Sequence, residues 1–221
     1  MTIYPFVFIG GGADEVTYDT EKHIAHLTSK DDLYHTYVKT LEMFKVLKEN
    51  NVEYDYIFRT NTSTYLLVKQ LLSFLEMDLE SGPMLYISTL LINQDNGGIP
   101  FSRGDFMIFT KSLVDDILNV RGLPYDSMID DVGIGGVMHH LYGNEYIKEH
   151  IKEVDIINNP TMPITKTKSA YAIRTNMFKK YEPATVLLIC HKAYKEMEDT
   201  IEVSPPHNIT KIETLYGVIP L

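Results

Sequence analysis

The chain has 221 residues, a formal net charge of −10 and a single cysteine. This length fits one sizeable domain with one core, so a single domain is expected over residues 1–221. The acidic balance argues against a general nucleic-acid or anionic-membrane binder, and one cysteine excludes a disulfide framework or cysteine metal cluster. The N-terminus has no signal-peptide pattern, and no apolar run is long enough to cross a bilayer. We therefore expect a cytoplasmic protein.

The first half of the chain alternates apolar strands with amphipathic helices. Ile3 to Ile9 is an apolar run that ends in three glycines, which predicts a strand followed by a turn. Asp31 or Asp32 then caps a long helix to Asn50, in which apolar residues recur at helical spacing on one face.

The stretch Tyr54 to Tyr65 begins as an alternating strand and ends in the polar cluster Arg59-Thr60-Asn61-Thr62-Ser63-Thr64. An amphipathic run from Tyr65 to Leu75 follows, which predicts a helix. The cluster is therefore expected at the carboxyl end of a strand, where open α/β sheets bind ligands. For this stretch alone, the simpler interpretation is that Thr60 to Thr64 cap the helix.

The second half of the chain continues the alternation. Strands are predicted at Met84 to Ile92, Phe106 to Phe109 and Val154 to Ile157. Helices are predicted at Lys111 to Val120, with Thr110 as its cap, and at about Glu182 to Asp199. A polar loop from Asn93 to Arg103 is of the kind that carries function on such a scaffold. The alternation predicts an α/β protein with a mostly parallel central sheet flanked by helices.

Two adjacent carboxylates, Asp130 and Asp131, stand at the start of a further predicted helix. One interpretation is purely structural, because acids suit the first turn of a helix, whose dipole stabilises their anions. The functional alternative is that one carboxylate is a general base for a substrate hydroxyl in a dry cleft.

Three motifs follow one another in a recognisable order. They are Tyr-Asp-Tyr-Ile-Phe-Arg-Thr-Asn-Thr-Ser at 54–63, Phe-Ser-Arg-Gly-Asp-Phe-Met-Ile-Phe-Thr-Lys-Ser-Leu-Val at 101–114, and Asp-Asp-Val-Gly-Ile-Gly at 130–135. Their order resembles the GT-A glycosyltransferases of the β1,3-galactosyltransferase and Fringe-like group, and related viral and bacterial enzymes. The resemblance covers about Pro5 to Leu141 and implies a compact GT-A-like (Rossmann-like) fold. That group has a further strand and helix before the segment that matches Tyr4 to Gly10, so the resemblance implies either a domain trimmed on that side or a nucleotide-base pocket built differently.

The resemblance assigns roles by position in the motifs. Asp131 matches the catalytic carboxylate and Asp130 its acidic neighbour. Arg59 matches the basic residue before the metal-binding DXD acids, which the group carries in Tyr-Asp-Tyr-x-x-Lys-Thr-Asp-Asp-Asp. In this chain Asn61, Thr62 and Ser63 stand where the three acids are expected. These residues can coordinate but supply no anionic charge, so the role of Mn²⁺ or Mg²⁺ is left open.

The donor and acceptor sides extend beyond these positions. Arg59 with Asn61, Thr62 and Ser63 is expected to hold the donor diphosphate, and Arg174 is a further candidate for the phosphates. On the acceptor side the candidates are Arg103, Gly104 and Asp105. The alternative for the two charged members is that they are loop charges facing water.

The resemblance implies a glycosyltransferase that moves a sugar from a nucleotide-sugar donor, expected to be a UDP-sugar, to a hydroxyl of a glycan acceptor. Asp131 would be the general base of an inverting reaction. Two alternatives remain open: a catalytically silent nucleotide- or sugar-binding domain with the same fold, and a module of a longer multidomain transferase. A virus-encoded enzyme acting in the host cytoplasm would also fit.

Overall fold

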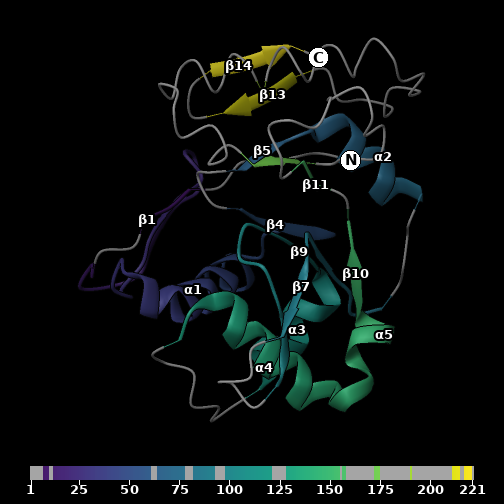
Figure 1. Cartoon of the computed structure of the whole chain (residues 1–221). Helices are drawn as coiled ribbons and strands as arrows, with labels where there is room; N and C mark the ends of the chain where they lie inside the picture. The colour runs from purple at the N-terminus through teal and green to yellow at the C-terminus, as the bar shows by residue number, and fades with distance from the viewer. Residues whose placement is uncertain are drawn as a thin grey trace, which may run out of the picture.

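The computed structural model describes residues 7–9, 12–60, 64–77, 82–92, 98–120, 128–154, 156–157, 172–174, 190, 211–214 and 217–220. The strands are β1 (Val7–Ile9), β2 (Thr17–Asp19), β3 (Ile24–His26), β4 (Tyr56–Thr60), β5 (Thr64–Leu66), β6 (Leu85–Ile87), β7 (Leu90–Ile92), β8 (Pro100–Ser102), β9 (Phe106–Thr110), β10 (Ile151–Glu153), β11 (Ile156–Ile157), β12 (Ala172–Arg174), β13 (Lys211–Thr214) and β14 (Gly217–Pro220). The helices are η1 (Leu33–His35), α1 (Thr36–Glu49), α2 (Val68–Met77), α3 (Lys111–Asn119), α4 (Asp130–Tyr142), η3 (Gly143–Glu145) and α5 (Tyr146–His150) (Figure 1).

The central four-stranded sheet has the order β10-β6-β9-β4. Strands β4 and β6 both pair antiparallel with β9, and β10 pairs parallel with β6. Three strands therefore share one direction, and β9 lies between two of them in the opposite direction. The expectation of a mostly parallel sheet is wrong for this part of the chain. Its physical reason is the connection from β6 to β9, which runs through the antiparallel β7–β8 pair and has no crossover helix in its described residues, 88–92 and 98–105.

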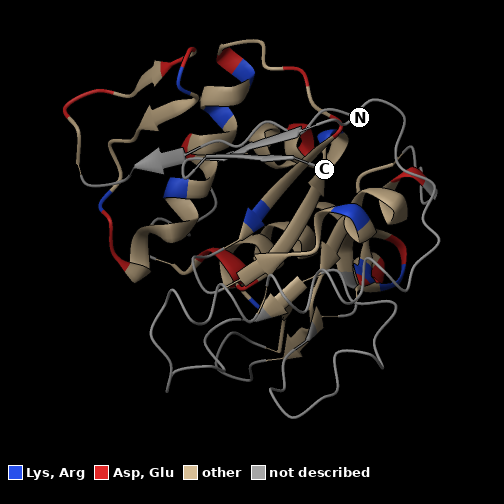
Figure 2. Ribbon diagram, turned by 90° about the horizontal axis from the view of Figure 1, so that it is seen from above, with Lys and Arg blue, Asp and Glu red and all other residues tan. Residues whose placement is uncertain are grey.

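The sheet has an apolar layer on each face, because side chains of a strand alternate between its faces. One layer joins β6 and β9 to α1, α3, α4 and α5, and its sheet residues include Leu85, Ile87, Met107 and Phe109. The opposite layer packs α2 against the same strands, through Tyr86, Phe106 and Ile108. Figure 2 shows that charged residues lie mainly on helices and loops around strands that carry little charge. The mixed α/β architecture is thus a sheet with helices on both faces.

Glycines in α4 let two neighbours approach this helix closely. A Cβ on Gly133 would lie 2.5 Å from a carbon of the Tyr37 ring, which belongs to α1. A Cβ on Gly135 would lie 2.6 Å from the carbonyl oxygen of Pro100 in β8. Both distances are shorter than real Cβ contacts allow, so the glycines set how near α1 and β8 come to the start of α4.

Several predicted elements are confirmed. The long helix α1 is present, but Asp32 accepts hydrogen bonds from the amides of Tyr34 and His35 and so caps the preceding η1; the N-cap residue of α1 itself, His35, makes no side-chain capping bond. Thr110 caps α3 by accepting from the amide of Leu113. The helix that begins with two carboxylates is α4.

Other boundaries differ from the prediction. The helix expected from Tyr65 begins at Val68, and strand β5 precedes it. Thr60 and Thr64 lie in strands β4 and β5, so the interpretation that they cap this helix is wrong. The amphipathic pattern from Tyr65 onward hides this boundary, because a buried strand and a helix start share apolar residues.

Two further expectations can be compared with the structure only over the described residues. Of the helix predicted from about Glu182 to Asp199, only Cys190, which is helical and buried, lies among the described residues. No helix in the part of the chain that the structure describes is both long and apolar enough to cross a membrane.

Candidate functional site

Three segments that are distant in the sequence meet at one end of β4. The pairing of β4 with β9 sets Thr60 opposite Phe106, so the end of β4 lies beside the Arg103–Asp105 turn that precedes β9. The start of α4 approaches the same turn, because a Cβ on Gly104 would lie 2.9 Å from the Oδ2 atom of Asp131. The structure therefore brings together residues that the sequence analysis selected from all three motifs.

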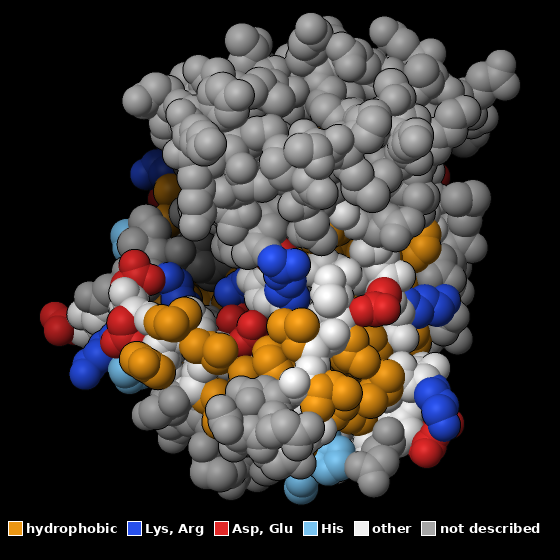
Figure 3. All heavy atoms as spheres, in the orientation of Figure 1, with side chains coloured by type: hydrophobic (Ala, Val, Ile, Leu, Met, Phe, Trp, Pro, Cys, Tyr) orange, Lys and Arg blue, Asp and Glu red, His pale blue; other side chains and the backbone are white. Residues whose placement is uncertain are grey.

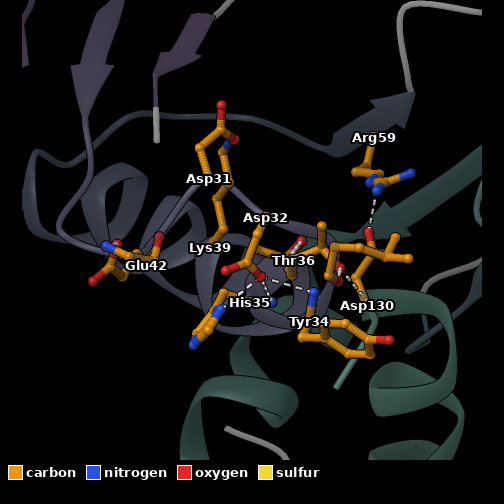
Figure 4. Close-up of polar contacts among 12 residues, drawn as sticks. Asp31, Asp32, Tyr34, His35, Thr36, Lys39, Glu42, Arg59 and Asp130 are labelled. Atoms are coloured by element: carbon orange, nitrogen blue, oxygen red, sulfur yellow. Dashed lines mark hydrogen bonds and ion pairs between the residues drawn. The ribbon is translucent and has the colours of Figure 1, made fainter. Parts of the chain in front are cut away.

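Arg59 is the residue that joins these segments. Its guanidinium forms an ion pair with the carboxylate of Asp130 through Nη2 (Figure 4). Its Nη1 donates a hydrogen bond to the carbonyl oxygen of Gly104. The side chain of Arg59 as a whole is 18% exposed. Arg59 thus links β4, the turn before β9 and α4.

Asp130 is buried, and burial raises the pKa of its carboxyl group above the ordinary value. The positive charge of Arg59 opposes this effect, as do hydrogen bonds from backbone amides. The pairing fits the general rule that a buried charge requires a partner. Asp130 is therefore the buried member of the two carboxylates, and its charge is paired with Arg59.

Asp131 is partly exposed and is the carboxylate of the pair that can meet a ligand. Partial burial raises its pKa, and the negative charge of Asp130 raises it further. A hydrogen bond of 2.8 Å from the amide of Val132 to Oδ1, the charge of Arg59 and the Gly104 backbone act in the opposite direction. A carboxylate with a raised pKa accepts a proton more readily, which is the property of a general base.

The start of α4 is also held by Thr36, which the sequence analysis missed. The amide of Asp130 donates to the Thr36 hydroxyl oxygen at 3.0 Å, across a separation of 94 positions. The Thr36 hydroxyl in turn donates to the carbonyl oxygen of Leu33 at 2.9 Å. A threonine in the first turn of a helix is commonplace, so nothing in the local sequence indicates this contact.

The acceptor-side candidates divide into a buried and an exposed part. Asp105 is 1% exposed, and its carboxylate accepts from the Ser88 hydroxyl at 2.6 Å and pairs with Nε of Arg103 at 3.3 Å. Asp105 therefore stabilises the turn, and its buried carboxylate is not accessible to a sugar acceptor. Arg103 keeps 35% of its side chain exposed beside this carboxylate, so it is not the fully solvated loop charge of the alternative interpretation.

The donor-side candidates lie partly outside the described residues. Asn61, Thr62 and Ser63 are not described, but both flanking strand ends are. Arg174 in β12 pairs with Thr64 in β5, the residue that follows them. The Thr64 hydroxyl donates to the carbonyl oxygen of Asp105 at 2.8 Å. Among the described residues, Arg59 and Thr64 therefore both contact the Arg103–Asp105 turn.

No group of three or more His, Cys, Asp or Glu side chains suited to hold a metal ion occurs among the described residues. The carboxylates nearest to Arg59 are engaged by that guanidinium and by backbone amides. Searches with the sequence found no matching family model and no matching curated protein.

Proposed function

We propose that the chain is a glycosyltransferase that transfers a sugar from a nucleotide-sugar donor to a hydroxyl group of a glycan acceptor. The observation that supports this most is the pair of carboxylates at the start of α4. One is buried and paired with Arg59, and the other is partly exposed with a raised pKa beside the Gly104 turn. Acidic groups with perturbed pKa values cluster at functional sites, because chemistry requires them there despite their cost in stability.

Asp131 is the general base in this proposal. Its carboxylate takes the proton of the acceptor hydroxyl while that oxygen forms a bond to the anomeric carbon of the donor sugar. The bond from the anomeric carbon to the phosphate oxygen breaks at the same time, and the nucleoside diphosphate leaves with the electron pair. Attack opposite the leaving group inverts the anomeric configuration, as expected from the resemblance to inverting enzymes.

Charge near the leaving group is supplied by Arg59. Two of its nitrogens contact Asp130 and Gly104, and a guanidinium has further N–H donors for a phosphate oxygen. Asn61, Thr62 and Ser63 add hydrogen-bond donors in the same proposal, and Arg174 adds a second positive charge. Stabilising the leaving group is the electrostatic part of the mechanism. No step of the proposal passes through a metal ion, and Mn²⁺ is one variable of its test.

Donor hydrolysis tests the proposal without knowledge of the acceptor. A panel of nucleotide sugars, beginning with UDP-sugars, is incubated with the protein, and released nucleoside diphosphate is measured. Each reaction is run after EDTA treatment, with and without added Mn²⁺. For a hydrolysed donor, Asp131→Asn is expected to lower the rate by about 10²–10⁴-fold, while thermal stabilisation by that donor is kept.

Asp115→Asn is the matched control, because Asp115 is an acid on the outer side of α3 that contacts two lysines. It should hydrolyse the donor at the wild-type rate. Asp131→Asn turning over at the wild-type rate would show that the base is another group.

The second candidate is a nucleotide- or sugar-binding domain without catalysis. It is favoured by the contacts of Arg59, because the carboxylate of Asp130 already neutralises much of the charge offered to a phosphate. Thermal stabilisation by a nucleotide sugar with no release of nucleoside diphosphate, with or without Mn²⁺, would select this candidate.

A further inference from the structure

The turn η1 exposes two large apolar side chains close to the carboxylates. Leu33 is 64% exposed and Tyr34 is 65% exposed. Figure 3 shows hydrophobic side chains gathered near acidic and basic ones around the middle of this face. Single exposed apolar residues are common on protein surfaces and need no explanation by themselves. The position of this turn is what distinguishes it.

Two consecutive hydrogen bonds through Thr36 connect η1 to the backbone of Asp130. The carbonyl oxygen of Leu33 accepts from the Thr36 hydroxyl, and the same hydroxyl oxygen accepts from the amide of Asp130. A third contact joins the same segments, since the amide of Tyr37 donates to the carbonyl oxygen of Met128 at 3.3 Å. Figure 4 shows Tyr34 and Asp130 on the same side of the start of α1. The turn is therefore fixed to the helix start that carries both carboxylates.

The turn is also fixed internally. The Oδ1 atom of Asp32 accepts from the amides of Tyr34 and His35, at 2.9 and 3.1 Å. The same oxygen lies 2.7 Å from Nδ1 of His35. A backbone held in this way loses little further freedom when a ligand contacts it, and a tyrosine adds only two side-chain torsions. An exposed aromatic ring on such a turn is preorganised for contact.

We propose that Tyr34 is the acceptor-contacting residue of this site, and that its ring packs against the apolar C–H face of an acceptor pyranose. This inference rests on the proposed transferase function, because it takes the acceptor to bind beside the start of α4, to which η1 is joined through Thr36. An aromatic ring offers a flat apolar surface, and the phenol hydroxyl offers one hydrogen bond at its rim. The assignment also gives the site an exposed residue that can contact the acceptor, which Asp105 cannot do because its carboxylate is buried and hydrogen-bonded to Ser88.

Ligand-observed saturation-transfer NMR tests the contact directly. The probes are methyl β-D-galactopyranoside and methyl β-D-glucopyranoside, each titrated against the full chain. Tyr34→Ala is expected to weaken binding of the bound glycoside about tenfold, as for the loss of one aromatic contact. Tyr34→Phe keeps the ring and should bind within about twofold of the wild type.

Val16→Ala is the matched control, because Val16 is 42% exposed and lies before β2, outside the residues of the site. It should leave the affinity unchanged. Thermal unfolding of each variant checks folding, and no loss is expected from a side chain as exposed as Tyr34.

Three outcomes overturn the inference: the wild type transfers saturation to neither glycoside, Tyr34→Ala binds as tightly as the wild type, or Tyr34→Phe binds as weakly as Tyr34→Ala. None of them affects the donor-hydrolysis result with Asp131→Asn. A donor hydrolysed through Asp131, together with an unchanged affinity in Tyr34→Ala, would retain the function and reject the acceptor contact.

Discussion

Asp115 in α3 and the pair Asp130 and Asp131 at the start of α4 all lie near positive charges, but their pKa values shift in opposite directions. Asp115 in α3 lies 2.9 Å from Nζ of Lys48 and 2.7 Å from Nζ of Lys111, and these contacts lower its pKa. Asp130 and Asp131 at the start of α4 share the charge of Arg59, yet both have raised pKa values. Water accounts for the difference, because the side chain of Asp115 is 33% exposed and that of Asp130 is 5% exposed.

At the start of α4 the removal of water therefore outweighs a favourable partner charge. A surface ion pair gains little, since both charges are already solvated, and it costs little to form. A buried pair loses hydration that its mutual attraction only partly returns. Two adjacent acids in such a place therefore lower the stability of the folded protein.

The largest change in stability is expected when the cation beside the buried aspartate is removed, compared with removal of a cation beside Asp115. Arg59→Met leaves Asp130 buried without its partner charge and is expected to lower the free energy of unfolding by about 3–5 kcal/mol. Lys48→Met removes one cation of the surface group and should change it by less than about 0.5 kcal/mol. Urea unfolding of both variants measures the two values.

A double variant separates lost charge from lost packing. Adding Asp130→Asn to Arg59→Met removes the buried charge and should recover more than half of the lost stability. Equal stability of the single and double variants would mean that Arg59 acts through packing alone.

The second test moves the carboxylate of Asp131 without removing it. In Gly104→Ala the new Cβ would lie 2.9 Å from Oδ2, so the carboxylate must shift. Donor hydrolysis is expected to fall about tenfold or more, because catalysis is sensitive to displacements of less than 1 Å. The cost in stability should be about 1 kcal/mol or less, since a side-chain end can move.

Gly82→Ala is the control for this change, because a Cβ at Gly82 would meet nothing within 4 Å. Its donor hydrolysis should match that of the wild type. Equal rates in Gly104→Ala and Gly82→Ala would show that the position of the Asp131 carboxylate does not limit the reaction.

The smallest expected effects concern the pH dependence of stability, and their signs are opposite. A raised pKa means that the folded protein binds the Asp131 proton more tightly than the unfolded chain does. Stability is then lost as pH rises from the ordinary aspartate range toward the raised pKa. Asp131→Asn removes this loss and should stabilise the protein by about 0.5–1 kcal/mol at pH 7, an advantage that disappears at low pH.

Asp115 has a lowered pKa, so its contribution is present above the ordinary range and is lost as pH falls. Asp115→Asn should destabilise the protein at pH 7 by less than about 0.5 kcal/mol, because the group is partly solvated. Thermal unfolding across the pH range measures both differences. Stability shifts of the same sign in the two variants would contradict the role assigned to burial.

Elements with a complete local signature could be predicted from the sequence. The cap at Thr110 and the helix after Asp130 are confirmed, because a cap and a helical period lie within a few residues of each other; Asp32 caps η1, the turn before the long helix, instead of the helix itself. Strand β5 was missed because its apolar residues continue into the pattern of α2. Strand direction was mispredicted because it depends on how the β7–β8 pair returns the chain, which periodicity does not encode.

Sequence patterns are enough to locate side chains able to do chemistry relative to helix starts and strand ends. They place Arg59 near the end of a strand and Asp130 and Asp131 in the first turn of a helix. Which of these side chains is buried follows from the folded structure, because burial depends on neighbours far away in the chain. Asp130 faces Arg59 across 71 positions of sequence, Asp105 is covered, and Asp131 alone of the three keeps partial access to solvent. Solvent access, set by packing, therefore separates the candidate base from the acids that support the site.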